Sequence, residues 1–313
     1  PGRCEVGGRR KGGLQMSPLP VLDKTTPIAI VAAGRLGSSL ARALLDAGYN
    51  VVAVSSRSQD HREWLSSRME EVVVTESAQS AANLASVVFV TGPDAMIAEI
   101  CDSLEWRSHQ AVLHCAGVLP VSTLSNAAGQ GAAIGGIHPL QTFPSPDSSD
   151  RLKETSFAIE SDNPNLLDWL KTLVTDLGGS SVEIESRQRP TYHASAVMAC
   201  GLLAGLVGLA AEMWEPLGID RDEALKRLIP LIRSTVDSLD QQGLPLAITG
   251  PFVRGDVETV KSHLGATDAN SGETGRAYAA LALASLHIAR QQGGITDEDY
   301  ESIKTLLSPE NRQ

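Results

Sequence analysis

The stretch that most constrains this chain lies near its start, where an apolar run passes through a short turn into a helical pattern. The run 28–31 shows no alternation of apolar and polar residues, which is typical of a strand that is covered on both faces. Leu36, Leu40 and Leu44 then recur at helical spacing, and Gly48 is a typical helix stop. The pattern predicts a strand, a tight turn and a helix.

The turn has the pattern Ala32-x-Gly34-x-x-Gly37, which is the dinucleotide-binding pattern G-x-G-x-x-G with alanine in the first position. Gly34 would let the backbone approach a pyrophosphate that faces the helix N-terminus, and Gly37 would let the helix pack closely on the strand. Ala32 fits the first position while its φ stays negative. The residues expected to contact a dinucleotide here are Ala33, Gly34, Arg35, Leu36 and Gly37.

A second apolar run, 50–54, ends in Ser55, Ser56 and Arg57. An acidic residue in this region would bind the ribose 2′-hydroxyl of NAD, whereas an arginine accommodates the 2′-phosphate of NADP. No acidic residue is present, and hydroxyl and guanidinium groups are the donors that a phosphate prefers. The sequence therefore predicts NADP as the cofactor, while an ordinary polar loop after a strand remains the alternative.

Short apolar runs and helical segments alternate along the first half of the chain, with further strands expected to begin near residues 72, 87, 111, 133, 157 and 181. This alternation predicts an α/β fold, a doubly wound parallel Rossmann sheet, and the helical signal after Arg187 predicts an all-helical C-terminal domain. We expect residues 1–23 to lie outside the folded domains, as a disordered or cloning-derived segment. The NADP-binding domain should span 24–186, and the helical substrate and dimerisation domain 187–313.

The first C-terminal helix includes residues 194–211, which carry no charge and approach the length of a membrane span. Because this stretch is mostly Ala and Gly and lacks basic or aromatic flanks, we expect a buried helix instead. Further helices are expected over 222–242, from about 255, over 274–290 and over 297–307.

Composition and charge exclude several classes of partner. The net charge of -11 argues against nucleic acid or an anionic membrane as the main partner. Four cysteines without C-x-x-C spacing favour free thiols and a cytoplasmic location, and the sequence shows no metal-ligand spacing. The segment 1–15 lacks the apolar core of a signal peptide, and Met16 is expected to be the natural start.

Three further stretches, 114–117, 138–143 and 246–260, are more specific than the glycine turn. Together with Tyr192-His193-Ala194, they make the chain resemble the Rossmann-like oxidoreductases that carry a C-terminal domain of unknown function 2520. That family is similar to the group of 6-phosphogluconate and 3-hydroxyisobutyrate dehydrogenases, ketopantoate reductase and pyrroline-5-carboxylate reductase. The resemblance implies NADP binding, reductase chemistry and, by analogy, a homodimer formed through the C-terminal helices. The chain departs from the family at Ala32, which is usually Gly, and at Cys200-Gly201, where Ser-Asn is typical.

Catalytic groups of an open α/β sheet gather beyond the carboxyl ends of its strands. His138 is a candidate there, with a structural histidine as the alternative, and His193 is the predicted proton donor because the wider group places a catalytic lysine in that region. Thr91 and Pro93 after one strand, and His114 and Cys115 after another, are expected to contact the cofactor, with a purely structural His114 as the alternative.

In the C-terminal half, Arg254 could bind a substrate carboxylate, with Thr249 and Asp256 beside it. The alternative is a simple turn whose Asp256 caps the next helix. The preferred hypothesis is an NADP(H)-dependent oxidoreductase that transfers hydride to or from a small anionic carbonyl or imine compound, with its active site between the two domains. The rival hypothesis is a non-catalytic NADP-binding or regulatory protein.

Overall fold

The computed structural model describes residues 19–311, and contacts between residues divide the chain into two units, up to Ala196 and from Val197. The predicted domain boundary at 186/187 lies in a short turn that precedes a helix. The division between the two units falls at the end of that helix. Most of the predicted outer segment 1–23 falls outside the described residues, but Leu19 is buried in the core of the first unit.

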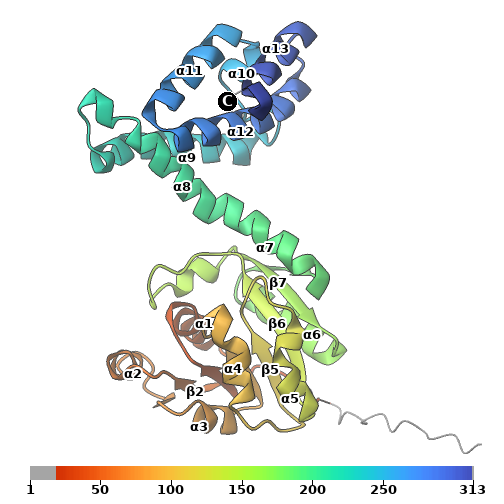
Figure 1. Ribbon diagram of the computed structural model, residues 1–313. Coiled ribbons are helices and arrows are strands. Elements are labelled where there is room, and N and C mark those ends of the chain that lie inside the picture. Colours follow the sequence, from red (N-terminus) through yellow and green to blue (C-terminus); the bar gives the residue numbers. More distant parts are fainter. Residues whose placement is uncertain (1–18, 312–313) are drawn as a thin grey trace, which may run out of the picture. The chain divides into compact units, whose positions relative to one another are not determined.

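One eight-stranded sheet organises the first unit, in the order β3-β2-β1-β4-β5-β6-β7-β8. Figure 1 labels β2, β5, β6 and β7 of this sheet. Its strands are β1 (Ile28–Val31), β2 (Val51–Ser55), β3 (Val73–Thr75), β4 (Val87–Val90), β5 (Ala111–His114), β6 (Ala133–Pro139), β7 (Ser156–Ser161) and β8 (Ser180–Glu183). Its α-helices are α1 (Arg35–Asp46), α2 (Gln59–Ser66), α3 (Ala78–Asn83), α4 (Ile97–Asp102), α5 (Ser125–Gly129), α6 (Pro164–Asp176) and α7 (Arg189–Val197).

Alternate residues of the strands enter two separate cores, which confirms the predicted doubly wound sheet. Ile28 and Ile30 of β1 pack in the cluster that contains the buried leucines of α1 and α6, while Ala29 and Val31 pack in the cluster of α3, α4 and α5. Uninterrupted apolar strands are therefore required, because both faces of the sheet are covered.

The predicted parallel order holds from β1 to β6, but β7 runs antiparallel to β6 and β8 runs parallel to β7. A parallel return requires a crossover of a dozen or more residues, usually a helix. The connection after β6 contains only one short 3₁₀ helix, Ser149–Leu152, so the chain returns in the opposite direction.

The second unit is helical, as predicted. Its helices are α8 (Leu203–Glu212), α9 (Arg221–Gln242), α10 (Pro251–Arg254), α11 (Val257–Asn270), α12 (Gly272–Ala289) and α13 (Asp297–Leu307), preceded by a π-helical turn, Met198–Leu202. Its buried core lies among α11, α12 and α13, and Figure 1 shows these helices together.

The expectation of a buried helix over 194–211 is wrong. By length and composition alone, the helix Ser186–Leu217 could cross a membrane. Only 6% of the most apolar stretch of this helix is buried inside the protein. Every residue from 197 to 206 is exposed. Periodicity and composition identify an apolar helix, but they do not say whether the same chain covers it.

Candidate functional site

A cavity of about 520 Å³ lies beyond the carboxyl ends of β2, β1 and β4, at the edge of the sheet where α/β proteins bind ligands. The strand order reverses there, because β2 and β4 lie on opposite sides of β1. The cavity is lined by Ala32, Ala33, Ser55, Ser56, Arg57, Ser58, Glu76, Ala78, Pro93, Met96, Glu99, Ile100 and Ser103.

Five of the predicted cofactor residues line this cavity, namely Ala33, Ser55, Ser56, Arg57 and Pro93. The others lie around it or further along the same edge. Gly34 has open space where a side chain would stand, and it begins α1 without a side-chain cap. The first turn of α1 also carries no acidic residue, so its N-terminus is free to face an anion.

Gly37 and Thr91 act together in packing. A Cβ at Gly37 would lie 2.3 Å from Thr91 Oγ1, so the predicted close contact between helix and strand requires glycine. The Thr91 hydroxyl donates to the Val31 carbonyl oxygen at 3.2 Å. Thr91 therefore stabilises the turn through this hydrogen bond, and it does not line the cavity. Arg35 is exposed and Leu36 is half-buried at the start of α1, and neither lines the cavity.

Ala32 departs from expectation, because its φ is +58° and not negative. This left-handed conformation costs an L-residue with a Cβ about 1–2 kcal/mol. Two hydrogen bonds from β2 hold the turn: Ala32 N–H donates to Ser55 Oγ at 3.1 Å, and Ala33 N–H donates to the Ser55 carbonyl oxygen at 2.8 Å. Ser55 is thus engaged in shaping the turn as well as lining the cavity.

The loop that carries Arg57 is held in place from α2. Arg62 donates to the carbonyl oxygens of Ser56 and Arg57, each at 2.9 Å, and its guanidinium lies 3.4 Å from the Glu76 carboxylate. The Glu76 charge is therefore offset by a paired cation, while the exposed Arg57 forms none of the ion pairs found in the described chain. Arg57 is free to bind an anion.

The second group of functional side chains lies further along the same sheet edge, after β5 and β6. His138 Nδ1 and the Tyr192 hydroxyl form a hydrogen bond of 2.8 Å, and the rings of His138 and His193 lie 6.1 Å apart between centroids. Both imidazoles converge on Gly117: a Cβ there would lie 2.6 Å from His193 Cδ2 and 3.0 Å from His138 Nε2. The predicted catalytic residues His138 and His193 are therefore brought together.

Burial and positive neighbours keep His138 neutral. Burial, followed by the charges of His193 and Arg189, lowers the pKa of His138 to about 4. Burial raises the pKa of Tyr192 to about 12, so the phenol keeps its proton. At neutral pH the pair is an uncharged imidazole and an uncharged phenol that share one hydrogen bond.

His114 is fully buried, and its Nδ1 accepts a hydrogen bond from the Ala116 N–H at 3.2 Å. Burial, and then the Arg189 charge, lowers its pKa to about 3. Burial also raises the pKa of the Cys115 thiol to about 12. His114 therefore stabilises the turn that carries Gly117, and neither His114 nor Cys115 lines the cavity.

Arg189 is fully buried beneath this turn. It forms an ion pair with Glu160 of β7 and donates to the Ala116 carbonyl oxygen at 3.0 Å. The pair anchors the first turn of α7, the helix that carries Tyr192 and His193, to the sheet. A buried cation with a matched carboxylate fixes position strongly, because separating the pair would leave an uncompensated charge.

The predicted substrate residues Thr249, Arg254 and Asp256 lie in the second unit, so neither unit by itself brings them together with the histidines. Asp256 caps α11 by accepting from the Thr259 N–H at 3.0 Å and the Thr259 hydroxyl at 2.7 Å. Arg254 is exposed at the end of α10. The cap is the alternative that the sequence left open, and the substrate roles stay predictions.

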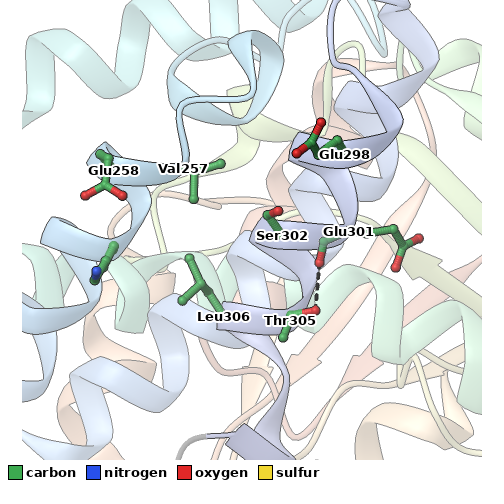
Figure 2. Close-up of a pocket in the computed structure, with 8 residues that line it drawn as sticks. Val257, Glu258, Glu298, Glu301, Ser302, Thr305 and Leu306 are labelled. Carbon is green, nitrogen blue, oxygen red and sulfur yellow. Dashed lines mark hydrogen bonds between the residues drawn. The ribbon is translucent and has the colours of Figure 1, made fainter.

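A second cavity, of about 570 Å³, lies between α11 and α13 (Figure 2). Glu258, Glu298 and Glu301 line it beside a single lysine, Lys261, and Figure 2 shows the Thr305 hydroxyl bonded to the Glu301 carbonyl oxygen. A cavity with this excess of carboxylates is unsuited to phosphate groups. It contains none of the predicted site residues.

Sequence reasoning missed three residues that shape the site. Arg62 follows the serine-rich loop by one helical turn, and Ser58 caps α2, accepting from the His61 N–H at 3.2 Å. The sequence could have indicated that cap, because a serine directly before a helical pattern is a typical N-cap. Tyr192 entered the sequence analysis only through the family resemblance, and no local pattern indicated its hydrogen bond with His138, which lies 54 positions away.

The comparisons agree with this architecture. Residues 20–139 match the Rossmann-like domain, and residues 155–285 match the domain of unknown function DUF2520. This chain is a Rossmann-like domain joined to a DUF2520 domain. The predicted resemblance is thereby confirmed, and the match over 155–285 spans the last strands of the sheet and most of the helical unit.

Solved structures of reductases share the fold. A candidate NADP oxidoreductase from Bacteroides fragilis is 26% identical, with a TM-score of 0.68 over 84% of this chain and 99% of that one. A 1-pyrroline-5-carboxylate reductase from Streptococcus pyogenes is 16% identical (TM-score 0.59, 90% and 100% covered), and an imine reductase from Pseudomonas sp. is 19% identical (TM-score 0.58, 90% and 99% covered). No curated protein matches the sequence significantly.

Proposed function

We propose that this chain is an NADP(H)-dependent oxidoreductase that transfers hydride to or from a small anionic carbonyl or imine compound. One observation carries the proposal: the cavity with the free Arg57 and the His138–His193 pair lie along one edge of one sheet, over strands β2, β1, β4, β5 and β6 in that spatial order. An extended dinucleotide needs this arrangement, with phosphate groups at one end and proton-handling groups at the other.

The residues present fit NADP. Ser56, Ser58 and Arg57 would hold the 2′-phosphate, and the uncapped start of α1 at Gly34 would face the pyrophosphate. The nicotinamide end would then lie toward Gly117, where the absence of a side chain leaves the backbone approachable. The cofactor, when bound, supplies or accepts a hydride; the chain supplies binding, orientation and the proton.

The two histidines have different proposed roles. When the Tyr192 hydroxyl donates to His138 Nδ1, the proton of the neutral imidazole lies on Nε2, beside Gly117. His138 would then donate a hydrogen bond to the substrate oxygen or nitrogen as negative charge develops there, while His193 would provide the proton. An imidazole with a pKa of about 4 suits the first role and not the second.

Substrate turnover and cofactor binding test the proposal together. Consumption of NADPH is measured with small keto acids and cyclic imines as acceptors, for the wild type and for His193→Ala. We expect turnover for at least one acceptor class and its loss in the variant, with NADPH affinity unchanged. Tight NADPH binding without turnover of any acceptor would favour the rival hypothesis of a non-catalytic NADP-binding protein.

Tyr192→Phe tests the positioning of His138. The variant keeps the ring but loses the hydrogen bond, which is worth roughly 1 kcal/mol, so kcat should fall about fivefold while the KM for NADPH stays constant. The ¹⁵N chemical shifts of His138 give an independent measurement, since they report which ring nitrogen carries the proton. A wild-type imidazole protonated on Nδ1 would contradict the proposed role.

A further inference from the structure

The cavity beyond β2, β1 and β4 has two walls of different chemistry. The wall that follows β2 carries the hydroxyl and guanidinium groups that would hold a 2′-phosphate. The other wall is the helical segment after β4, of which Met96, Glu99, Ile100 and Ser103 line the cavity. Their spacings of three, one and three place these four residues on one face of a helix, which combines apolar and polar side chains.

This second wall lies close to the turn that carries Ala32. A Cβ at Gly92 would lie 2.6 Å from Ile100 Cδ1 and 3.6 Å from the Ala32 Cβ, so the glycine lets the helical segment approach the turn. On another face of the same segment, Ile97 and Cys101 are buried in the core. That burial fixes which face of α4 is left to line the cavity.

The place of the adenine ring follows from the proposed function, on which this inference rests. In NADP(H) the ribose that carries the 2′-phosphate also carries the adenine base, so a 2′-phosphate at Arg57 brings the base into the same cavity. The half-buried Ala78, Met96 and Ile100 supply the apolar surface that suits a flat aromatic ring. The polar groups of this wall are then available to the edge of the base.

Glu99 is the carboxylate of this cavity that has no partner. The Glu76 carboxylate, which also lines the cavity, lies 3.4 Å from the Arg62 guanidinium. The Ser103 hydroxyl donates to the Ile100 carbonyl oxygen at 2.8 Å. Within residues 19–311, the Glu99 carboxylate forms neither an ion pair nor a hydrogen bond. A carboxylate only accepts hydrogen bonds, so a ligand group that pairs with Glu99 has to be a donor.

Adenine offers such a donor in its exocyclic amino group, whereas hypoxanthine and guanine carry a carbonyl oxygen at the same ring position. We propose that Glu99 is a specificity-determining residue, whose carboxylate accepts a hydrogen bond from the adenine amino group and so selects aminopurine over oxopurine dinucleotides. An oxopurine would bring its carbonyl oxygen against the carboxylate and leave two acceptors without a proton between them.

The test compares the binding of NADPH with that of its hypoxanthine analogue, in which a carbonyl oxygen replaces the amino group. The fluorescence of the reduced nicotinamide reports the binding of both compounds. The ratio of the two dissociation constants isolates the contribution of the base, because the phosphates and the nicotinamide are common to both. For the wild type we expect NADPH to bind about tenfold more tightly, a moderate preference because Glu99 is exposed.

Glu99→Gln should remove the preference. An amide both donates and accepts hydrogen bonds, so the ratio should come within about twofold of one. Asp102→Asn makes the matched change on the same helix, at an exposed residue that does not line the cavity, and should keep the wild-type ratio. Glu76→Gln should also keep it, because Arg62 already holds that carboxylate. Circular dichroism checks that each variant is folded.

The outcomes separate this inference from the proposed function. Equal affinity of the wild type for the two dinucleotides would overturn the role of Glu99, and so would a preference that survives Glu99→Gln or that disappears in Glu76→Gln. In each of these cases tight binding of NADPH would leave the proposed function standing. Binding of neither dinucleotide would overturn both.

Discussion

The two units differ in how completely each buries its own apolar surface. In the first unit both faces of the sheet are covered by helices of the same chain, and the strand residues from Ile28 to Val31 are fully buried. In the second unit the buried cluster lies among α11, α12 and α13, while α9 exposes most of an apolar face. The first unit can therefore build a ligand site by itself, whereas the second exposes apolar residues along α9.

The largest expected effect comes from the buried ion pair of the first unit. Arg189→Met leaves the Glu160 carboxylate, whose side chain is only 12% exposed, without its cationic partner, and the free energy of unfolding of that unit should fall by roughly 3–5 kcal/mol. Urea unfolding followed by tryptophan fluorescence measures it. The matched control is Arg187→Met, whose partner Glu185 is exposed, with an expected change within about 1 kcal/mol. Equal losses in the two variants would contradict the anchoring role of Arg189.

The buried histidines should make the first unit sensitive to acid. The pKa of His138 is about 4 in the folded chain against a usual value near 6.5. Between those pH values the unfolded chain binds a proton that the folded chain does not, so stability should fall as pH is lowered from about 6.5 to 4, by roughly 3 kcal/mol for this residue. His138→Asn should reduce the slope, and the remainder should come from the buried His114, whose pKa is lowered to about 3. His109→Asn, at an exposed position, should leave the slope unchanged. A slope that survives His138→Asn unchanged would remove His138 as its source.

Arg57 should distinguish the two nicotinamide cofactors. Arg57→Ala removes a charge-assisted contact to the 2′-phosphate, which is worth about 2 kcal/mol, so NADPH affinity should fall about 30-fold while NADH affinity stays constant. Fluorescence titration measures both. Arg42→Ala, which changes an exposed arginine paired with Asp46 on α1, is the control. Equal losses for both cofactors would leave Arg57 without a 2′-phosphate role.

The smallest expected effect is a gain in stability. Ala32→Gly relieves the left-handed conformation at φ +58°, and the free energy of unfolding should rise by roughly 0.5–1 kcal/mol. Ala47→Gly, at a residue with a φ of -82°, should give no gain. Thermal unfolding compares the two variants. A loss of stability in Ala32→Gly would show that the alanine methyl group contributes more through packing than its conformation costs.

Sequence reasoning identified the strands and the sheet edge that carries the candidate site because both leave local signals. Unbroken apolar runs mark buried strands, and the residues after them mark the edge at which ligands bind. It did not predict the reversed direction of β7, the φ of Ala32 or the partner of Tyr192, since each depends on contacts between residues distant in sequence. The exposure of the helix over 197–206 was missed for a different reason. An apolar composition indicates that a segment has surface to bury, but it does not identify what buries it.

We propose that one sheet edge holds NADP with its phosphate end at Arg57 and its reactive end at Gly117. A crystal structure of the complex with NADP⁺ tests this directly. We expect the 2′-phosphate within hydrogen-bond distance of Ser56 and Arg57, and the nicotinamide ring against Gly117 beside His138. A nicotinamide ring away from Gly117, or a 2′-phosphate that does not contact Arg57, would contradict it.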